Sequence, residues 1–439
     1  MQSLSGTMIA SNPFSGRIVA LTFFLVFVLV AFFYTQSPDI SGITHAPSAL
    51  WQSATGSSGA KPPSFHTSQG GEGISYQLDI PASVGCEDKV NELQQRLIQE
   101  YTRLFEGIRY ANIWGYLETE NKGDAAIWSA QQILLSMLGI DTMEACRFMH
   151  KECDMDKFRK SLKDHEPHSG IIMAGGGNFN DYYWEDQPSR MKMISNFTEY
   201  PVRAFPQSVF MTKPDRIEMT KDAFNQHKNL QLAARDKPSY DWLEGTFRQS
   251  EGIESVLVPD IAFMWGNRSD FRVNTKKTHD ILILARKDME ISAGDSSDIE
   301  FGEGTLDLGS AGNVTYQKVD WKFTDTPGIN PDKETSEGYK ETGKNQRAWA
   351  KAIAGFELLG SARFVITDRL HGHILSTVIG VPHVLMDSKL GKNLNFHNTW
   401  TRDCECTRIT SSIGEALDVA KLYFDSIDSD DAMTGKRHG

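Results

Sequence analysis

A guanidinium and two imidazoles follow a short apolar run near the C-terminal end of the chain. The residues are Asp368-Arg369-Leu370-His371-Gly372-His373, placed between the strand-like run 364–367 and an apolar stretch of helical character. A strand that ends here would bring Arg369, His371 and the amides of the next helix to one anion-sized volume. Because histidine exchanges protons near neutral pH, we predict that His371 transfers a proton. His373 is better explained as a structural histidine inside the helix.

Two further arginines end apolar runs in the same way. Arg235 ends "LQLAAR" and Arg286 ends "LILAR", and an acid follows each within two residues. Such an arginine forms either a fork for a carboxylate or phosphate, or half of a structural ion pair, and the residues alone leave both open. The recurrence of the pattern at Arg369 favours anion binding.

Three glycines lie at the end of a predicted buried strand, in "GGGNFNDYYW" (175–184). Gly175, Gly176 and Gly177, with Asn178 beside them, would let bare backbone amides approach an anion or a sugar closely. The spacing matches neither the dinucleotide fingerprint nor a P-loop, so a nucleotide site is not indicated. A tight structural turn is the alternative.

Polar residues at three other junctions are weaker candidates. Asp124 in "NKGDAAI" begins a predicted helix, where it is either an N-cap or a ligand to a sugar hydroxyl, and the residues alone favour the cap. Gln207 and Ser208 follow a proline at a strand end and suit hydroxyl recognition, with turn chemistry equally open. The D-x-D at 154–156 lies in a highly charged run that indicates a solvated helix, and we predict no metal site.

Short β-branched runs alternate with helical patterns around these residues, which is typical of α/β units with parallel sheets. Helices are predicted over 86–108, 121–138 and 345–362. Strands are predicted in 111–117, 169–178, 202–211, 230–235, 253–263, 280–290, 313–321, 364–367 and 381–387, with a polar excursion up to about residue 312. The simplest architecture is α/β, with two Rossmann-like domains that face each other across a cleft, where ligands bind at strand C-terminal ends.

The N-terminal region indicates membrane attachment. Residues 18–34 are apolar and uncharged, and Arg17 precedes them, which favours a single-pass anchor over the alternative of a cleaved signal peptide. The positive-inside bias then leaves the catalytic region in the lumen. The predicted divisions are a cytosolic tail (1–17), the anchor (18–34), a flexible stem rich in Ser, Gly and Pro (35–80), two α/β domains (81–270 and 271–425) and a disordered tail (426–439).

Composition narrows the functional classes. The 45 Lys and Arg are outnumbered by 57 Asp and Glu, giving a net charge of -12, so nucleic acid is not an expected partner. Five cysteines suit an oxidising compartment with one or two disulfides and one thiol left over, although their pairing stays open. Sequons at Asn196, Asn267 and Asn313 fit a luminal domain.

These motifs together resemble the polysaccharide pyruvyltransferase family, in its eukaryotic, Golgi-type branch. The resemblance runs in order through "NKGDAAI", "GGGNFNDYYW", "FPQS", "ARD", "LILARKD" and "TDRLHGHILSTVIGVPHVLMD", and it ends near "GKNLNFHNTW" (391–400). It implies a GT-B-like fold and transfer of a pyruvyl group from phosphoenolpyruvate to a sugar residue of a glycan, which leaves a pyruvate ketal and phosphate. No cofactor is expected. A type II protein of the Golgi or another secretory membrane would follow.

The resemblance also implies residue roles. Arg369, Leu370 and His371 would contact phosphoenolpyruvate, with Arg235 as a second anion contact, so that 271–425 forms the donor side and 81–270 the acceptor side. One motif departs from the family, whose glycine segment commonly continues Asn-x-Gly-Asp, because Asn180 precedes Asp181 here. Two alternatives are a GT-B-type glycosyltransferase that uses a nucleotide sugar and a non-catalytic carbohydrate-binding relative.

Overall fold

The computed structural model describes residues 86–147, 153–288, 290–291, 299–326 and 343–434. The predicted cytosolic tail, anchor and stem lie outside these residues, so the membrane anchor stays a prediction. Within the described ranges, no helix is both long and apolar enough to cross a bilayer.

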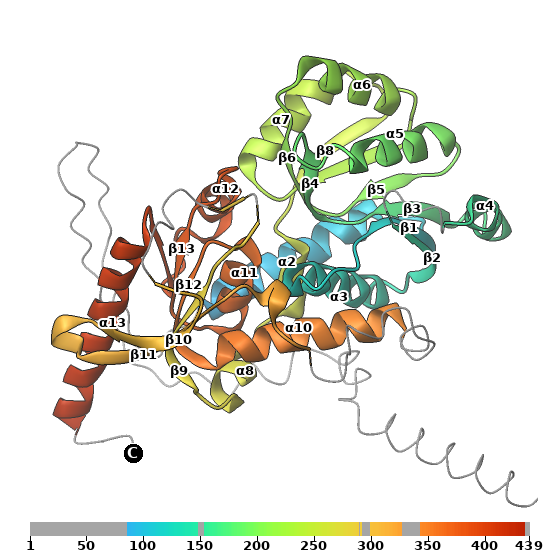
Figure 1. Ribbon diagram of the computed structural model, residues 1–439. Helices are drawn as coiled ribbons and strands as arrows, with labels where there is room; N and C mark the ends of the chain where they lie inside the picture. The colour runs from blue at the N-terminus through green and yellow to red at the C-terminus, as the bar shows by residue number, and fades with distance from the viewer. Residues whose placement is uncertain (1–85, 148–152, 289, 292–298, 327–342, 435–439) are drawn as a thin grey trace, which may run out of the picture. The chain divides into compact units, whose positions relative to one another are not determined.

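The first sheet has eight strands that all pair in parallel (Figure 1). Its order is β2-β1-β3-β5-β7-β6-β4, and β8 pairs with β7. The strands are β1 (Tyr110–Tyr116), β2 (Asp141–Arg147), β3 (Ser169–Met173), β4 (Gly176–Asn180), β5 (Val202–Ala204), β6 (Gln207–Phe210), β7 (Leu230–Ala234) and β8 (Ile253–Leu257). Its central strands read as continuous apolar runs because helices cover both faces of such a sheet.

The second sheet has six strands in the order β10-β11-β9-β12-β13-β14. They are β9 (His279–Leu284), β10 (Gly302–Asp307), β11 (Asn313–Val319), β12 (Ala362–Thr367), β13 (His383–Met386) and β14 (Thr407–Thr410). All pairs are parallel except the β10–β11 hairpin at one edge. The prediction of a polar excursion up to residue 312 was therefore wrong for β10, whose mostly exposed, glycine-containing edge sequence lacks an apolar strand pattern.

Eleven α-helices lie before, between and after these strands in the described residues. They are α2 (Glu87–Leu104), α3 (Lys122–Met137), α4 (Met155–Asp164), α5 (Asp186–Asn196), α6 (Pro214–Phe224), α7 (Lys237–Phe247), α8 (Ser269–Asn274), α10 (Lys344–Gly360), α11 (Leu370–Ile379), α12 (Lys392–Phe396) and α13 (Ile413–Thr434). Helix α13 extends to Thr434, past residue 426 where the tail was predicted to begin, and no glycine or proline interrupts it after Gly414. Asp154 of the D-x-D caps α4, and the following residues are exposed, as the solvated-helix interpretation predicts.

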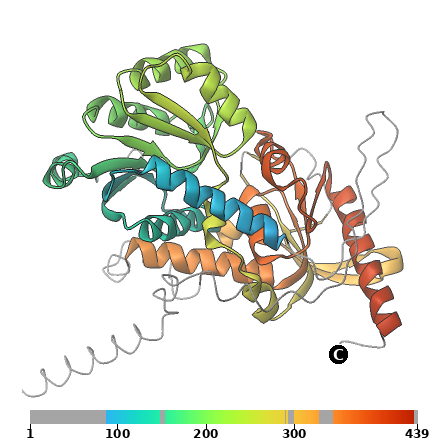
Figure 2. The same ribbon diagram turned by 180° about the vertical axis from the view of Figure 1, so that it is seen from behind.

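A shared core joins the two sheets. Helix α10 belongs to the second half of the sequence but packs against α3 of the first half (Figure 1). One buried cluster contains Leu134 of α3, Phe356 of α10 and Leu284 of β9. From behind, α2 runs across the molecule and contacts α11 (Figure 2). The α/β class is therefore confirmed, and the described residues form one compact unit whose two sheets divide between β8 and β9.

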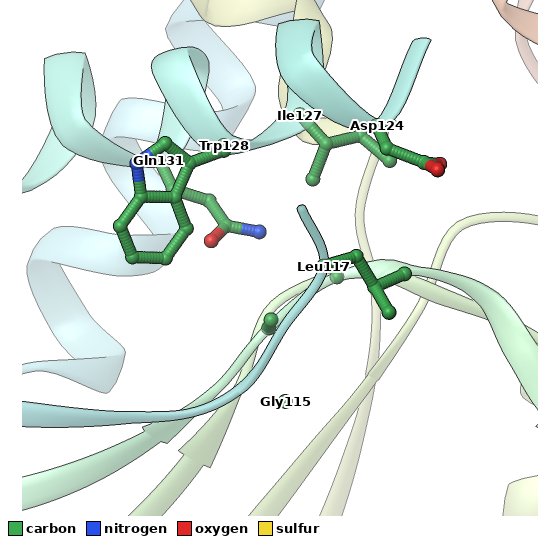
Figure 3. Close-up of a pocket in the computed structure, with 8 residues that line it drawn as sticks. Gly115, Leu117, Asp124, Ile127, Trp128 and Gln131 are labelled. Atoms are coloured by element: carbon green, nitrogen blue, oxygen red, sulfur yellow. The ribbon is translucent and has the colours of Figure 1, made fainter. Parts of the chain in front are cut away.

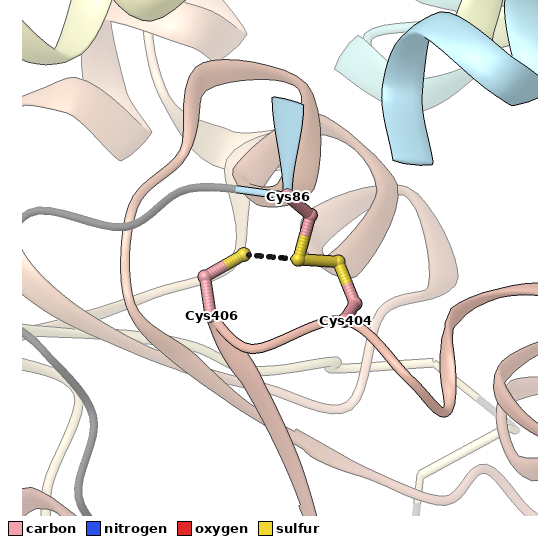
Figure 4. Close-up of side chains that lie close together, drawn as sticks. All are labelled: Cys86, Cys404 and Cys406. Atoms are coloured by element: carbon pink, nitrogen blue, oxygen red, sulfur yellow. Dashed lines mark hydrogen bonds between the residues drawn. A yellow bond between two sulfur atoms is a disulfide. The ribbon is translucent and has the colours of Figure 1, made fainter. Parts of the chain in front are cut away.

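Three cysteines meet where the N-terminal end of α2 lies beside the segment before β14 (Figure 4). Cys86 is bonded to Cys404, and the buried free thiol of Cys406 lies 3.2 Å from the Cys86 sulfur. Cys146 and Cys153 form a second disulfide, so two disulfides and one thiol agree with the cysteine count. The three clustered sulfurs lie within 4.8 Å of one another, but two of them are bonded together, so this cluster is a disulfide and not a set of metal ligands.

We expect substitutions of the two bonded cysteines of this cluster to have unequal effects on stability, because the third cysteine lies beside them. Cys86→Ser removes the sulfur that is bonded to Cys404 and lies close to Cys406. We therefore expect the free energy of unfolding to fall by about 2–5 kcal/mol. Cys404→Ser should lose less, because Cys406 is already close enough to bond with Cys86. Thermal unfolding and thiol counts of both variants test this. Equal destabilisation with two free thiols in Cys404→Ser would contradict the expectation.

Candidate active site

A cavity of about 250 Å³ opens where strands of both sheets end. Eight of the twelve predicted site residues line it, namely Asp124, Gly177, Asn178, Arg235, Arg286, Arg369, Leu370 and His371. The other lining residues are Leu117, Thr119, Asn121, Tyr183, Asp186, Glu290, Trp321, Lys322 and Lys392. The cavity therefore gathers several cations among polar side chains, although the protein as a whole is acidic.

The three arginines reach the cavity because each follows a parallel strand. Arg235 comes directly after β7, Arg286 follows β9 by two residues, and Arg369 follows β12 and precedes α11. The turn before α11 is fixed by a hydrogen bond from the Arg369 amide to the Thr367 hydroxyl, at 3.0 Å. Gly372 is required in this turn because an added Cβ would lie 2.5 Å from the same hydroxyl. Helix α11 therefore starts at the cavity with His371 in its first turn.

The Asp260 carboxylate lies close to both Arg235 and His371. Its Oδ2 atom accepts a hydrogen bond from Arg235 Nη1 at 2.8 Å and lies 3.5 Å from His371 Nε2, while its Oδ1 atom accepts from the Ala262 amide. Burial favours the neutral acid, but the charges of His371 and Arg235 outweigh it and hold the pKa of Asp260 well below its usual range. Asp260 is therefore a buried carboxylate that orients an arginine and a histidine together.

Arg286 and Arg369 are also held by acids. Arg286 donates to both oxygens of Asp288, at 2.7 and 3.0 Å, and lies 3.1 Å from Glu290. Arg369 donates to Asp320 at 2.5 Å, while its Nε atom has no hydrogen-bond partner in the described part of the chain. The two interpretations left open by the sequence are thus both realised, because these arginines form ion pairs and also line the cavity. The ion pairs fix the guanidinium groups before a ligand arrives.

Lys392 is a further cation that the sequence analysis missed. It begins α12 after Gly391, whose left-handed φ of 67° sets the turn, and it forms an ion pair with Glu290. Tyr183 also donates to Glu290, at 2.9 Å. Burial lowers the pKa of Lys392 to about 8, although Glu290 opposes this shift. A lysine after a glycine turn in "GKNLNF" is too common a pattern to have marked it.

Gly123 has no side chain, and the His371 ring packs into the space that this leaves. A Cβ added at Gly123 would lie 2.7 Å from both Cβ and Nδ1 of His371. These contacts are closer than unbonded atoms tolerate, so the imidazole packs against a bare Cα of α3. No sequence pattern marks this glycine, because its contact with His371 arises between residues that are distant in the chain.

We expect Gly123→Ala to impair catalysis more than folding. Alanine is the better helix former by about 1 kcal/mol, but its methyl group would push the His371 ring away from Asp260. We predict a fall in kcat of at least about tenfold, since small displacements of a reacting group are costly. Gly245→Ala is the matched control, because nothing lies within 4 Å of a Cβ added there in α7. Unchanged kcat in Gly123→Ala would refute this role.

Asp124 and the glycine run differ from their predicted roles. The preference for Asp124 as a helix cap was wrong, because Asn121 caps α3 and accepts from the Gly123 amide. Asp124 lies within the first turn of the helix, where it accepts from the Thr119 hydroxyl at 2.8 Å and lines the cavity. The glycines are not a free loop, because Gly176 and Gly177 already belong to β4. A Cβ at Gly177 would lie 2.8 Å from Arg235 Nη2, so this glycine makes room for the guanidinium.

Four predicted ligands do not line the main cavity. Gln207 is buried and donates to the Ala174 carbonyl, whereas Ser208 accepts from Arg235 Nε at 2.9 Å and donates to Asp236 at 2.6 Å. Ser208 therefore positions Arg235 from behind. Gly175 lines a smaller neighbouring pocket, and Gly176 lines neither of the two.

His373 is a buried structural histidine, as predicted. Its ring nitrogens lie 2.8 Å from His383 Nε2 and 2.8 Å from the Thr401 hydroxyl. Burial and the neighbouring histidines lower its pKa well below the usual value. The two histidines of the H-x-H run thus face different surroundings, and only His371 lines the cavity.

Several known proteins similar to this chain carry the name pyruvyl transferase. Residues 121–389 match the family model described as polysaccharide pyruvyl transferase. "Pyruvyl transferase 1" of Schizosaccharomyces pombe is 34% identical over 79% of this chain and 80% of its own length. "Putative pyruvyl transferase EpsO" of Bacillus subtilis is 27% identical over 56% of this chain and 73% of its own. A functionally uncharacterised protein of Klebsiella pneumoniae matches in structure with a TM-score of 0.47 and 14% identity, over 73% of this chain and 99% of its own.

Proposed function

Because the chain belongs to the polysaccharide pyruvyl transferase family, we propose that its 250 Å³ cavity binds phosphoenolpyruvate and a sugar of the acceptor glycan. The observation that carries this proposal is the convergence of Arg235, Arg286 and Arg369 on a cavity that His371 also lines. Phosphoenolpyruvate has a carboxylate and a phosphate, and a planar guanidinium can bind either one with two hydrogen bonds.

The arrangement of charges suits a small, multiply charged anion. Lys322 and Lys392 add to the three arginines, whereas the arginines are paired with the buried Asp260 and Asp320 and the half-buried Asp288. The arginines are therefore fixed at little further cost in conformational entropy when the anion binds. We assign Arg369 and Arg235 to the donor, with Leu370 as the apolar contact beside them.

The proposed reaction needs one acid that protonates the donor and one acceptor for the proton of each sugar hydroxyl. His371 in its protonated form donates a proton to the methylene carbon, which becomes the methyl group, and C2 becomes electrophilic. One sugar hydroxyl attacks C2 and loses its proton to the neutral imidazole. The second hydroxyl then replaces phosphate at C2 and closes the ketal, and its proton leaves with the phosphate. The arginines stabilise the charge of the departing phosphate.

Lys392 should make donor binding sensitive to pH. Its pKa is lowered to about 8, and a lysine carries charge only below its pKa, so the ammonium group is lost as the pH rises through this value. We expect KM for phosphoenolpyruvate to rise between about pH 7 and about pH 9. Lys392→Arg should abolish this rise because arginine stays charged, and Lys392→Met should have a high KM throughout. An identical pH profile in all three proteins would rule out this role.

Product analysis tests the proposed function. The purified full-length protein is incubated with phosphoenolpyruvate and a panel of oligosaccharides, and the acceptor mass and the released phosphate are measured together. We expect acceptors to gain the mass of one pyruvate less one water, with one phosphate per product. Transfer from a nucleotide sugar instead, or sugar binding with no turnover, would favour the glycosyltransferase or the non-catalytic alternative.

We further propose that the two sheets act as the two halves of a GT-B-like enzyme in a secretory compartment. Residues from both sheets line the cavity, which supports closure around the substrates. Two disulfides and exposed sequon residues at Asn196 and Asn313 favour a lumen, with 18–34 as a type II anchor in the Golgi. Glycosidase sensitivity and protease protection in intact vesicles test this orientation. If protease reached the catalytic region in intact vesicles and the region carried no glycan, the luminal orientation would be contradicted.

A further inference from the structure

A small side pocket adjoins the main cavity under the first turns of α3. It is lined by Gly115, Leu117, Asp124, Ile127, Trp128, Gln131, Ala174 and Gly175 (Figure 3). Leu117 and Asp124 line both spaces, so the side pocket continues from the main cavity. None of the arginines, the lysines or His371 of the main cavity lines it.

Gln131 is an unusual residue in this pocket. It is fully buried, and neither its amide oxygen nor its amide nitrogen has a hydrogen-bond partner among the residues that the structure describes. Leaving a buried polar group unpaired costs about 1–3 kcal/mol, so buried amides almost always have partners. Figure 3 shows the Gln131 amide pointing from α3 into the space above Gly115 and Leu117. Its partner is therefore not among the residues that the structure describes.

The size and lining of the pocket restrict that partner. The volume open to the centre of a water molecule is about 10 Å³, which is close to the minimum for a single water-sized group. Without a cation in its lining, the pocket offers nothing to an anionic group. Trp128 already donates its indole N–H to Asn345 at 2.8 Å, so Gln131 and Asp124 are the polar side chains that remain. A neutral hydroxyl fits these conditions.

We propose that this pocket is an acceptor subsite in which Gln131 recognises one sugar hydroxyl that does not take part in the reaction. This inference rests on the proposed function. The two reacting hydroxyls must reach C2 of the donor beside His371 and the arginines, which line only the main cavity. A third hydroxyl of the same sugar then enters the side pocket through the opening at Asp124. The Gln131 amide nitrogen donates a hydrogen bond to this hydroxyl or its amide oxygen accepts one from it, so Gln131 distinguishes sugars that carry the hydroxyl there.

A site built to hydrogen-bond a hydroxyl strongly rejects an analogue that lacks it, because its polar groups are left unpaired. We therefore expect one monodeoxy sugar, lacking a non-reacting hydroxyl, to bind the wild-type enzyme about 10- to 100-fold more weakly than its parent. Gln131→Leu should weaken binding of the parent sugar by a similar factor and remove the difference between parent and deoxy sugar. KM for phosphoenolpyruvate should be unchanged.

The experiment compares methyl galactoside, glucoside and mannoside with their monodeoxy analogues, using wild type, Gln131→Leu and the control Gln132→Leu. Gln132 is the next residue of α3 but lies near Thr142 and outside the pocket. Binding of the acceptor is followed by saturation-transfer NMR without phosphoenolpyruvate, and KM is measured with it. If Gln131→Leu fails to fold, Gln131→Met, which is unbranched and of similar length, replaces it.

Each outcome separates this inference from the proposed function. Loss of the deoxy penalty in the Gln131 variant, but not in the Gln132 variant, supports the subsite. Equal penalties in both variants and the wild type overturn it and leave Gln131 paired with a trapped water. If the wild type forms no pyruvylated product, the proposed function fails, while the NMR comparison still decides whether Gln131 recognises a sugar hydroxyl.

Discussion

Replacing His371 by asparagine is expected to lower kcat for pyruvyl transfer by about 10²- to 10⁴-fold, the usual contribution of a positioned acid or base. His371 is the histidine that lines the cavity, and its Nε2 atom lies 3.5 Å from the buried Asp260 carboxylate. Asparagine keeps polarity and part of the ring volume but cannot carry the proton. Because the arginines are untouched, KM for phosphoenolpyruvate should change by less than about threefold.

Steady-state kinetics and a thermal unfolding curve of the variant test this expectation. His168→Asn is the control, because His168 is exposed and its imidazole lies 3.1 Å from the backbone carbonyl of Gly107. A stable His371→Asn protein that retains kcat within about fivefold of the wild type would remove His371 from the chemistry. The proton would then have to come from another lining group, and Lys392 would be the next to test.

Replacing Asp260 by asparagine is expected to damage both binding and turnover. Asparagine retains the oxygen that accepts from the Ala262 amide but leaves Arg235 as a buried cation without its carboxylate. Removing one partner of a buried ion pair typically costs about 3–5 kcal/mol. Because the same carboxylate holds His371, we expect KM for phosphoenolpyruvate to rise through Arg235 and kcat to fall through His371, each by about tenfold or more.

If Asp260 had only a structural role, Asp260→Asn would lower the stability of the protein without raising KM and lowering kcat together. The comparison is Asp270→Asn, which breaks a more exposed ion pair with Arg268 and should leave both kinetic constants within about twofold. Kinetics measured well below the unfolding temperature of each variant separate the two effects. If Asp260→Asn proved unstable but kinetically normal, Asp260 would support the fold and not the reaction.

The sequence predicts much of the cavity because parallel strands end at a common edge. Arg235, Arg286 and Arg369 each follow an apolar strand, and this local pattern is visible without a structure. The sequence also predicts different roles for His371 and His373, because residues two positions apart in a helix do not share a face. The fold class and most central strands could be predicted because their apolar runs are long and continuous.

The remaining site residues could not be predicted because they act through contacts between distant parts of the chain. Asp260 meets His371 across 111 positions of sequence, and Gly123 meets the same ring across a still longer interval. The pKa of Lys392 is lowered by burial and by the nearby charges of Arg286 and Arg235, which the folded protein alone brings together. Gln207 and Ser208 are the first two residues of β6, and neither lines the cavity, since the side-chain direction in a short strand depends on local bends.

The central claim is that the arginine cavity transfers the pyruvyl group by breaking the bond between C2 and the ester oxygen of phosphoenolpyruvate. Its most direct test uses phosphoenolpyruvate with a heavy oxygen isotope in that bridging position, together with an acceptor glycan and the full-length protein. We predict that all of the label appears in the released phosphate, with one pyruvylated acceptor per phosphate and none of the label in the glycan. Label retained in the glycan, or phosphate released without pyruvylation, would contradict the account.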